Sequence, residues 1–200
     1  RPELEGLEPR SLWEVFGLIS SVPRPSFKEV QVQNALTEFC EAKGFSVQRD
    51  AAHNLVVSVP ASPGRESAPP IALQAHVDMV TIARDGFPHD FDTDAINLEV
   101  SEYNGRPILT AGNTTLGADN GIGVAAAVAA GFDPAVSHGP LELILTTNEE
   151  SGMTGAKELD GSLVTARQLI NLDSEEDDAI YVGCVGGQDS EVTFRSEEHT

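Results

Sequence analysis

The stretch LELILTTNEESG, residues 141–152, sets an apolar run directly before two adjacent glutamates, Glu149 and Glu150. No Lys or Arg lies within six residues of the pair on either side. A short apolar run of this kind predicts a buried strand, and two like charges at its end repel each other. The pair is therefore either two solvated loop acids or part of a site that holds a cation.

Two other short apolar runs also end in polar residues, namely IALQAHVDMV (71–80) and ARQLINLD (166–173). Runs of this type are typical of strands that are covered on both faces in a mostly parallel sheet. Between them lies GADNGIGVAAAVAAG (117–131), whose small apolar residues predict a tightly packed helix from Gly123 to Gly131. Strands that alternate with helices predict an α/β layered fold.

The N-terminal part predicts two amphipathic helices. Ser11 and Glu14 have the spacing of a capping box before a helical run that Pro23 ends, and Ser26 and Glu29 repeat this spacing before the second helix.

The segments FSVQRD (45–50) and NLVVSVP (54–60) predict a strand pair, and residues 84–113 predict a hairpin with loops. No linker divides the chain, so we expect one domain.

The composition of the chain argues against two classes of partner, nucleic acids and membranes. The chain has 200 residues, 40% hydrophobic and 22% charged, as in a globular protein. A net charge of −20 argues against a nucleic-acid partner, and no apolar stretch is long enough to span a bilayer, so we expect no membrane partner. The two cysteines, Cys40 and Cys184, form no motif, which is typical of a reducing cytoplasm.

Polar side chains follow the three predicted strands. In open α/β sheets, ligands bind beyond the carboxyl ends of the strands. The groups expected at this edge are His76, Asp78, Asp119, Glu149, Glu150 and Asp173. One imidazole with several carboxylates suits zinc, manganese or cobalt.

The spacing within this set suggests separate roles. His76 and Asp78 are two residues apart on a strand, so His76 could bind a metal while Asp78 holds its other ring nitrogen. One glutamate could face the metal while its neighbour reaches a metal-bound water. Taken singly, a His–Asp pair is more often structural, and Asp119 or Asn120 could simply cap the helix that follows.

In combination, the stretches LQAHVDMV, TTLGADNGIG, HGPLELILTTNEESGMTGA and INLDSEEDDAIYVGCVGG closely resemble the N-terminal part of the bacterial Xaa-His dipeptidase family. These enzymes, also called aminoacyl-histidine dipeptidase or peptidase D, hydrolyse carnosine. They belong to the co-catalytic zinc exopeptidases, with carboxypeptidase G and tripeptidase T. The resemblance implies a three-layer α/β catalytic domain with a mixed, mainly parallel sheet flanked by helices.

The resemblance also implies that residues 1–200 form the N-terminal portion of that catalytic domain. The lid or dimerisation domain and the C-terminal part of the catalytic domain would then lie outside this chain. We accordingly expect the complete protein to be a homodimer formed through the lid, in the cytoplasm.

A two-metal site follows from the same resemblance. It makes His76, Asp119 and Asp173 the ligands of one divalent ion, zinc foremost, with cobalt or manganese as alternatives. Asp119 would bridge to a second ion that Glu150 also binds. The last His ligand of that second site would lie outside this chain, so the second site is expected to be incomplete.

The implied catalytic residues are Glu149, as general base, and Asp78, which supports His76. The Asp119–Asn120 peptide is expected to be cis. The implied reaction is hydrolysis of Xaa-His dipeptides through attack by a metal-bound hydroxide. Two alternatives stay open: an inactive metal-binding fragment, or a related tripeptidase or N-acyl amino acid amidohydrolase. The family usually has PSxHE where this chain reads PSFKE (25–29), which affects the expected substrate preference.

Overall fold

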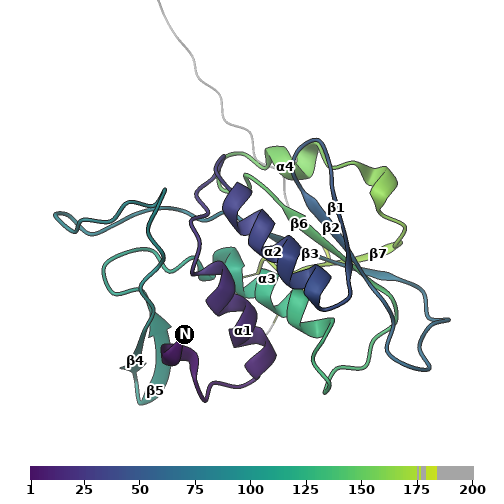
Figure 1. Cartoon of the computed structure of the whole chain (residues 1–200), viewed down its shortest axis with the longest axis horizontal. Helices are drawn as coiled ribbons and strands as arrows, with labels where there is room; N and C mark the ends of the chain where they lie inside the picture. The colour runs from purple at the N-terminus through teal and green to yellow at the C-terminus, as the bar shows by residue number, and fades with distance from the viewer. Residues whose placement is uncertain (175, 177–178, 184–200) are drawn as a thin grey trace, which may run out of the picture.

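A five-stranded mixed sheet forms the frame of the computed structural model, which describes residues 1–174, 176 and 179–183 (Figure 1). The strands lie in the order β1-β2-β6-β3-β7. Only β2 runs against its neighbours, so four strands point the same way and the predicted mixed, mainly parallel sheet is confirmed. The strands are β1 (Ser46–Arg49), β2 (Leu55–Val59), β3 (Ile71–His76), β6 (Leu141–Thr146) and β7 (Gln168–Asn171).

Three long helices share one hydrophobic core with this sheet: α1 (Arg10–Ile19), α2 (Val30–Ala42) and α3 (Ala118–Ala130) (Figure 1). The small side chains of α3 let it lie close against β3, while α2 packs against β1 and β2. The described residues also form three shorter helices: η1 (Pro2–Leu4), α4 (Thr154–Lys157) and η2 (Gly161–Leu163). Cys40 is buried in the core, and Cys184 lies outside the described residues.

The predicted capping boxes are wrong, although both helices exist. Ser11 lies inside α1, and its hydroxyl donates to Asp133 of a distant loop. Ser26 precedes α2 by several residues and donates to Asp78. Neither helix has a side-chain cap, because these polar side chains take partners that are far away in the sequence.

The expectation that all three strands are covered on both faces holds for β6 but is wrong for β7. All six residues of β6 are buried, whereas all four of β7 are exposed, with Leu169 at 55% and Ile170 at 50%. β7 is an edge strand that pairs only with β3. Its apolar residues therefore lie open to solvent in the described part of the chain.

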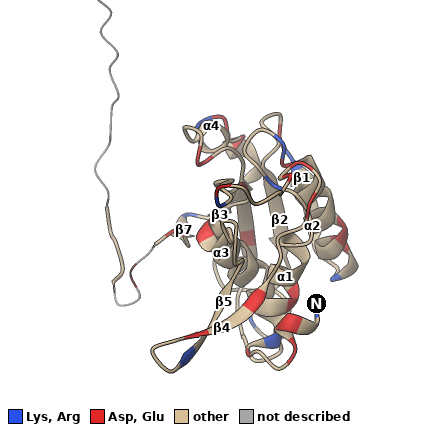
Figure 2. Ribbon diagram, turned by 90° about the vertical axis from the view of Figure 1, so that its left-hand side faces the viewer, with Lys and Arg blue, Asp and Glu red and all other residues tan. Residues whose placement is uncertain are grey.

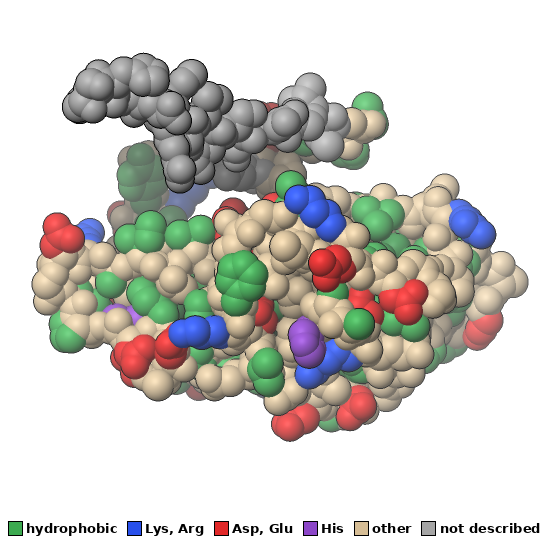
Figure 3. Space-filling model, turned by 90° about the horizontal axis from the view of Figure 1, so that it is seen from above, with side chains coloured by type: hydrophobic (Ala, Val, Ile, Leu, Met, Phe, Trp, Pro, Cys, Tyr) green, Lys and Arg blue, Asp and Glu red, His purple; other side chains and the backbone are tan. Residues whose placement is uncertain are grey.

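The predicted hairpin is present as β4 (Glu99–Tyr103) and β5 (Arg106–Thr110), which project away from the main sheet (Figure 1). Acidic residues are spread over many elements rather than gathered in one block (Figure 2). On the face seen from above, the few Lys and Arg side chains lie singly among acidic and apolar ones (Figure 3). No helix in the described residues is long and apolar enough to cross a bilayer.

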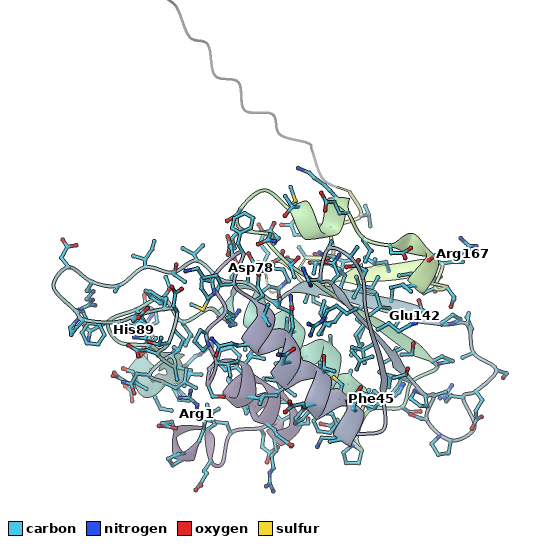
Figure 4. All side chains as sticks on the ribbon, turned by 45° about the horizontal axis from the view of Figure 1, so that its top comes forward. Arg1, Phe45, Asp78, His89, Glu142 and Arg167 are labelled. Carbon is cyan, nitrogen blue, oxygen red and sulfur yellow. The ribbon has the colours of Figure 1, made fainter. Side chains whose placement is uncertain are left out.

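Glu142 fixes the connection between β6 and β7. It points away from the helix-covered core, and its carboxylate accepts hydrogen bonds from the backbone of Thr165 and Ala166 and from the Thr165 hydroxyl. Figure 4 places it near Arg167, at the opposite end of the sheet from Asp78. Burial favours the neutral acid, but these donors outweigh it and hold the pKa of Glu142 below its usual range.

We predict that Glu142→Gln lowers the free energy of unfolding by about 1.5–3 kcal/mol at pH 7, since an amide nitrogen would face two backbone donors. A depressed pKa stabilises the fold above the unfolded value of about 4.3 and loses that effect as the pH falls through the folded pKa. The difference between the two proteins should therefore shrink below about pH 4. Urea unfolding across this range measures it, with exposed Glu38→Gln as control. Equal losses in both variants would contradict this role of Glu142.

Candidate metal centre

His76 ends β3 and lies in register with Thr146, the last residue of β6. The parallel pairing thus brings its imidazole beside the loop that carries Glu149 and Glu150. The side chain is only 1% exposed. Its Nδ1 lies 3.3 Å from the Asp78 carboxylate, and its Nε2 lies 3.0 Å from Asp119 Oδ1. One ring nitrogen is therefore held from behind, while the other faces the group of carboxylates.

Asp78 is fully buried and organises this side of the site. Its carboxylate accepts from the Ser26 hydroxyl at 2.7 Å and from the backbone N–H groups of Glu149 and Glu150 at 3.0 and 3.2 Å. Burial raises the pKa of Asp78, but the hydrogen bonds from His76, Ser26 and Glu149 outweigh it and lower the pKa overall. Asp78 is therefore an anion that holds both the imidazole and the glutamate loop.

The predicted ligands come together at this edge of the sheet. His76 Nε2 lies 3.7 Å from Asp173 Oδ2 and 3.9 Å from Glu149 Oε2. Two sets of potential ligand atoms each fit within 4.8 Å: His76, Asp119 and Glu150, and His76, Glu149 and Asp173. The structure therefore brings together all five residues, although it groups them differently from the sequence expectation. We name this cluster of His76, Asp119, Glu149, Glu150 and Asp173 the acidic rim.

The start of α3 delivers Asp119 to the acidic rim. Asp119 and Asn120 have non-helical backbone angles inside the span of α3, and the peptide between them is cis, as the resemblance implied. Gly117, with φ of 69°, makes the left-handed turn that precedes them. The simple reading of Asp119 or Asn120 as a side-chain cap is wrong, because neither side chain accepts a hydrogen bond from the first turn of α3 among the described residues, and Asp119 Oδ1 bonds to His76 instead.

Crowded negative charge dominates the electrostatics. Burial, followed by the charge of Asp119, raises the pKa of Glu150, and burial with the same neighbour raises that of Asp173 to about 6. Burial lowers the pKa of His76, but its hydrogen bond to Asp78 and the nearby carboxylates outweigh this and raise it to about 9. One imidazole nitrogen and four carboxylates suit a borderline divalent cation such as zinc, so the donor set fits a metal.

The segment between α1 and α2 supports the acidic rim through residues that the sequence motifs do not reveal. Glu29 Oε1 accepts from the backbone N–H of Asn148 at 3.0 Å, and Asn148 Oδ1 accepts from the N–H of Phe27. Arg24 donates to the backbone carbonyls of Val77 and Asp78. The usable signal was an arginine between two prolines, Pro23 and Pro25, in a chain with only 12 basic residues.

Comparison with solved structures places this arrangement among peptidases. The chain has a TM-score of 0.82 and 39% identity to the aminoacylhistidine dipeptidase of Vibrio alginolyticus, covering 88% of this chain and 35% of that one. A tripeptidase of Staphylococcus aureus gives a TM-score of 0.65 at 27% identity, covering 84% of this chain and 44% of that one. The fold is thus that of a peptidase catalytic domain, as expected.

Among curated proteins, the chain is 46% identical over 197 residues to the cytosol non-specific dipeptidase of Escherichia coli (strain K12). The match covers 98% of this chain and 39% of that protein, so the chain spans well under half the length of this relative. No family model matches the chain. The resemblance to dipeptidases that was seen in the sequence motifs is nevertheless confirmed over nearly the whole chain.

We predict that zinc raises the Tm of this chain and that a chelator reverses the rise, because a ligand bound only by the folded state stabilises it. At a free zinc concentration of 100 times Kd, the gain is about 2.7 kcal/mol. His76→Asn should remove most of the rise, as measured by differential scanning calorimetry. His138→Asn is the matched control, because the His138 ring bonds only to the carbonyl oxygen of its neighbour Gly139 among the described residues. Equal zinc-induced shifts in both variants would mean that zinc binds elsewhere on this acidic surface.

Proposed function

We propose that this chain forms the metal-binding part of the active site of a dipeptidase that acts on Xaa-His dipeptides such as carnosine. The observation that carries the proposal is the convergence of the five residues of the acidic rim at the carboxyl edge of a peptidase-like sheet. The 46% identity to a cytosol dipeptidase supports the reaction class.

In this proposal His76, Asp119 and Asp173 hold one divalent ion, and Asp119 with Glu150 holds a second. Zinc suits the donors best, with manganese and cobalt as alternatives. Bound there, such ions would act as Lewis acids on the scissile carbonyl and make water a stronger nucleophile. The ligand atoms of His76, Asp119 and Glu150 lie within 4.8 Å of one another, so these three side chains could contribute to holding a divalent ion.

The protein groups then have separate tasks. Glu149 would take the proton from the attacking water and give it to the leaving amine. Its side chain is about one third exposed, so water and a peptide substrate can reach this proton acceptor. Asp78 would keep the His76 ring in one orientation through Nδ1, which leaves Nε2 free to bind.

Several features of the complete protein belong to the same proposal. Residues 1–200 would be the N-terminal portion of its catalytic domain, and a further segment would add a lid, a dimer contact and the last His ligand. The name of the Vibrio relative supports preference for a C-terminal His, and that of the E. coli relative supports cytosolic location. The net charge of −20 supports a peptide rather than a nucleic acid as partner.

A second candidate is a metal-binding chain without activity. The described residues favour this candidate. If the first ion takes His76, Asp119 and Asp173, and Glu149 is kept as general base, only Asp119 and Glu150 of the acidic rim are left for the second ion. The two candidates differ in turnover but not in zinc binding.

We predict that Glu149→Gln, in the protein at its natural length, lowers kcat for β-alanyl-histidine by a factor of about 10² or more, the scale of general-base catalysis. Zinc affinity should stay unchanged, and Glu158→Gln, on an exposed surface, should keep full activity. Comparison of β-alanyl-histidine with alanyl-alanine in the same assay measures the preference for His.

Near-normal turnover in Glu149→Gln would contradict the role of Glu149 as general base. Zinc binding without hydrolysis of any dipeptide by the unaltered protein would favour the inactive candidate.

A further inference from the structure

Arg24 is a buried cation behind the acidic rim. Its side chain is 2% exposed, although it lies in an irregular segment between two prolines. One guanidinium nitrogen donates to the carbonyl oxygens of Val77 at 3.0 Å and Asp78 at 3.2 Å. The other donates to the carbonyl oxygen of Gly117. All three acceptors are backbone groups, so the Arg24 side chain is hydrogen-bonded to the main chain of two separate segments.

These two segments carry the ligands that face each other across the acidic rim. Val77 directly follows His76, and Gly117 precedes Asp119 by two residues. The planar fork of Arg24 therefore joins the backbone just after His76 to the backbone just before Asp119, while His76 Nε2 and Asp119 Oδ1 meet on the other side at 3.0 Å. Arg24 is itself anchored, because its carbonyl oxygen accepts from the N–H of Met79 at 3.2 Å.

Gly117, which precedes α3, and Gly121, in the first turn of α3, leave room for this guanidinium. A Cβ atom on Gly117 would overlap the Arg24 nitrogen that bonds there, and one on Gly121 would lie 2.8 Å from the same nitrogen. Gly117 also needs its left-handed φ, but Gly121 has no such backbone requirement. The absence of a side chain at Gly121 is therefore explained by the tight packing around it, in which Arg24 makes the shortest contact.

Burying the charged guanidinium of Arg24 costs free energy that an uncharged side chain at the same place would not cost. Burial lowers the pKa of Arg24 to about 10, while the charges of Asp78 and Asp119 act in the opposite direction. The guanidinium stays charged at neutral pH, and its Nε has no hydrogen-bond partner among the described residues. Well-packed apolar residues often replace such buried ions at no loss of stability. A role beyond folding would account for a cation here.

We infer that Arg24 is a positioning residue of the metal centre, which holds the backbones of Val77 and Gly117 so that His76 and Asp119 bind one cation together. Its positive charge also offsets part of the negative charge of the acidic rim before a metal arrives. The inference rests on the proposed function, because it requires a metal at this site. Only Arg has the planar fork that reaches acceptors on both segments.

Zinc titration calorimetry on the full chain tests this inference, with Arg24→Lys and Arg24→Met as variants. We expect each to bind zinc about 10–100 times more weakly than the unaltered chain, the range found when groups that orient metal ligands are removed. Arg49→Lys, in which an exposed arginine bonds to Asn34, should bind as before. The Tm of each metal-free variant is measured in parallel, and titrations are run well below it. A structural role alone would lower that Tm without changing the zinc affinity of the folded protein.

Gly121→Ala provides an independent test if an Arg24 variant does not fold. Alanine is favourable in a helix, and the change removes no ligand and no donor, yet its Cβ would displace the guanidinium. Weaker zinc binding by Gly121→Ala supports the inference. Zinc affinity within twofold of the unaltered chain in both Arg24→Lys and Gly121→Ala overturns it, while the proposed function stands. Absence of zinc binding in the unaltered chain overturns both.

Discussion

The rest of the site depends on the hydrogen bonds that the buried carboxylate of Asp78 accepts. An anion removed from water is stable only if it is surrounded by donors. Its donors come from three separate parts of the chain: the Ser26 hydroxyl, the His76 ring and the backbone of Glu149 and Glu150. Satisfying this one group therefore requires the end of β3, the segment before α2 and the loop after β6 to meet at one point.

The segment from Arg24 to Glu29 supports the same point from several directions. Arg24 lies behind the acidic rim, Ser26 bonds to Asp78, and Glu29 holds the N–H of Asn148. Burial is the largest cause of the raised pKa of Glu29, which shows how far this acid is withdrawn from solvent. The capping spacing of Ser26 and Glu29 is thus used for long-range contacts, so α2 begins without a side-chain cap. Local helix stability is given up for the geometry of the site.

Local patterns predicted most of the elements and the site residues. Apolar runs located β3 and β6, the small-residue run located α3, and the two-residue spacing of His76 and Asp78 predicted their common orientation. The support from Arg24 to Glu29 could not be predicted, because its contacts span 52 to 121 residues of sequence. The exposure of β7 could not be predicted from the sequence either, because it depends on which neighbours a strand has rather than on its own residues.

The position of two adjacent glutamates at the end of a buried strand now has a physical explanation. Their backbone N–H groups both donate to Asp78, which fixes the loop. The two carboxylates are then free to join the other members of the acidic rim. There, burial and the charge of Asp119 already raise the pKa of Glu150. The single positive charge of Arg24 offsets only part of the negative charge of these carboxylates, and it lies on the buried side of the acidic rim. A divalent cation bound in front would reduce the remaining repulsion, so binding of such a cation would stabilise the fold.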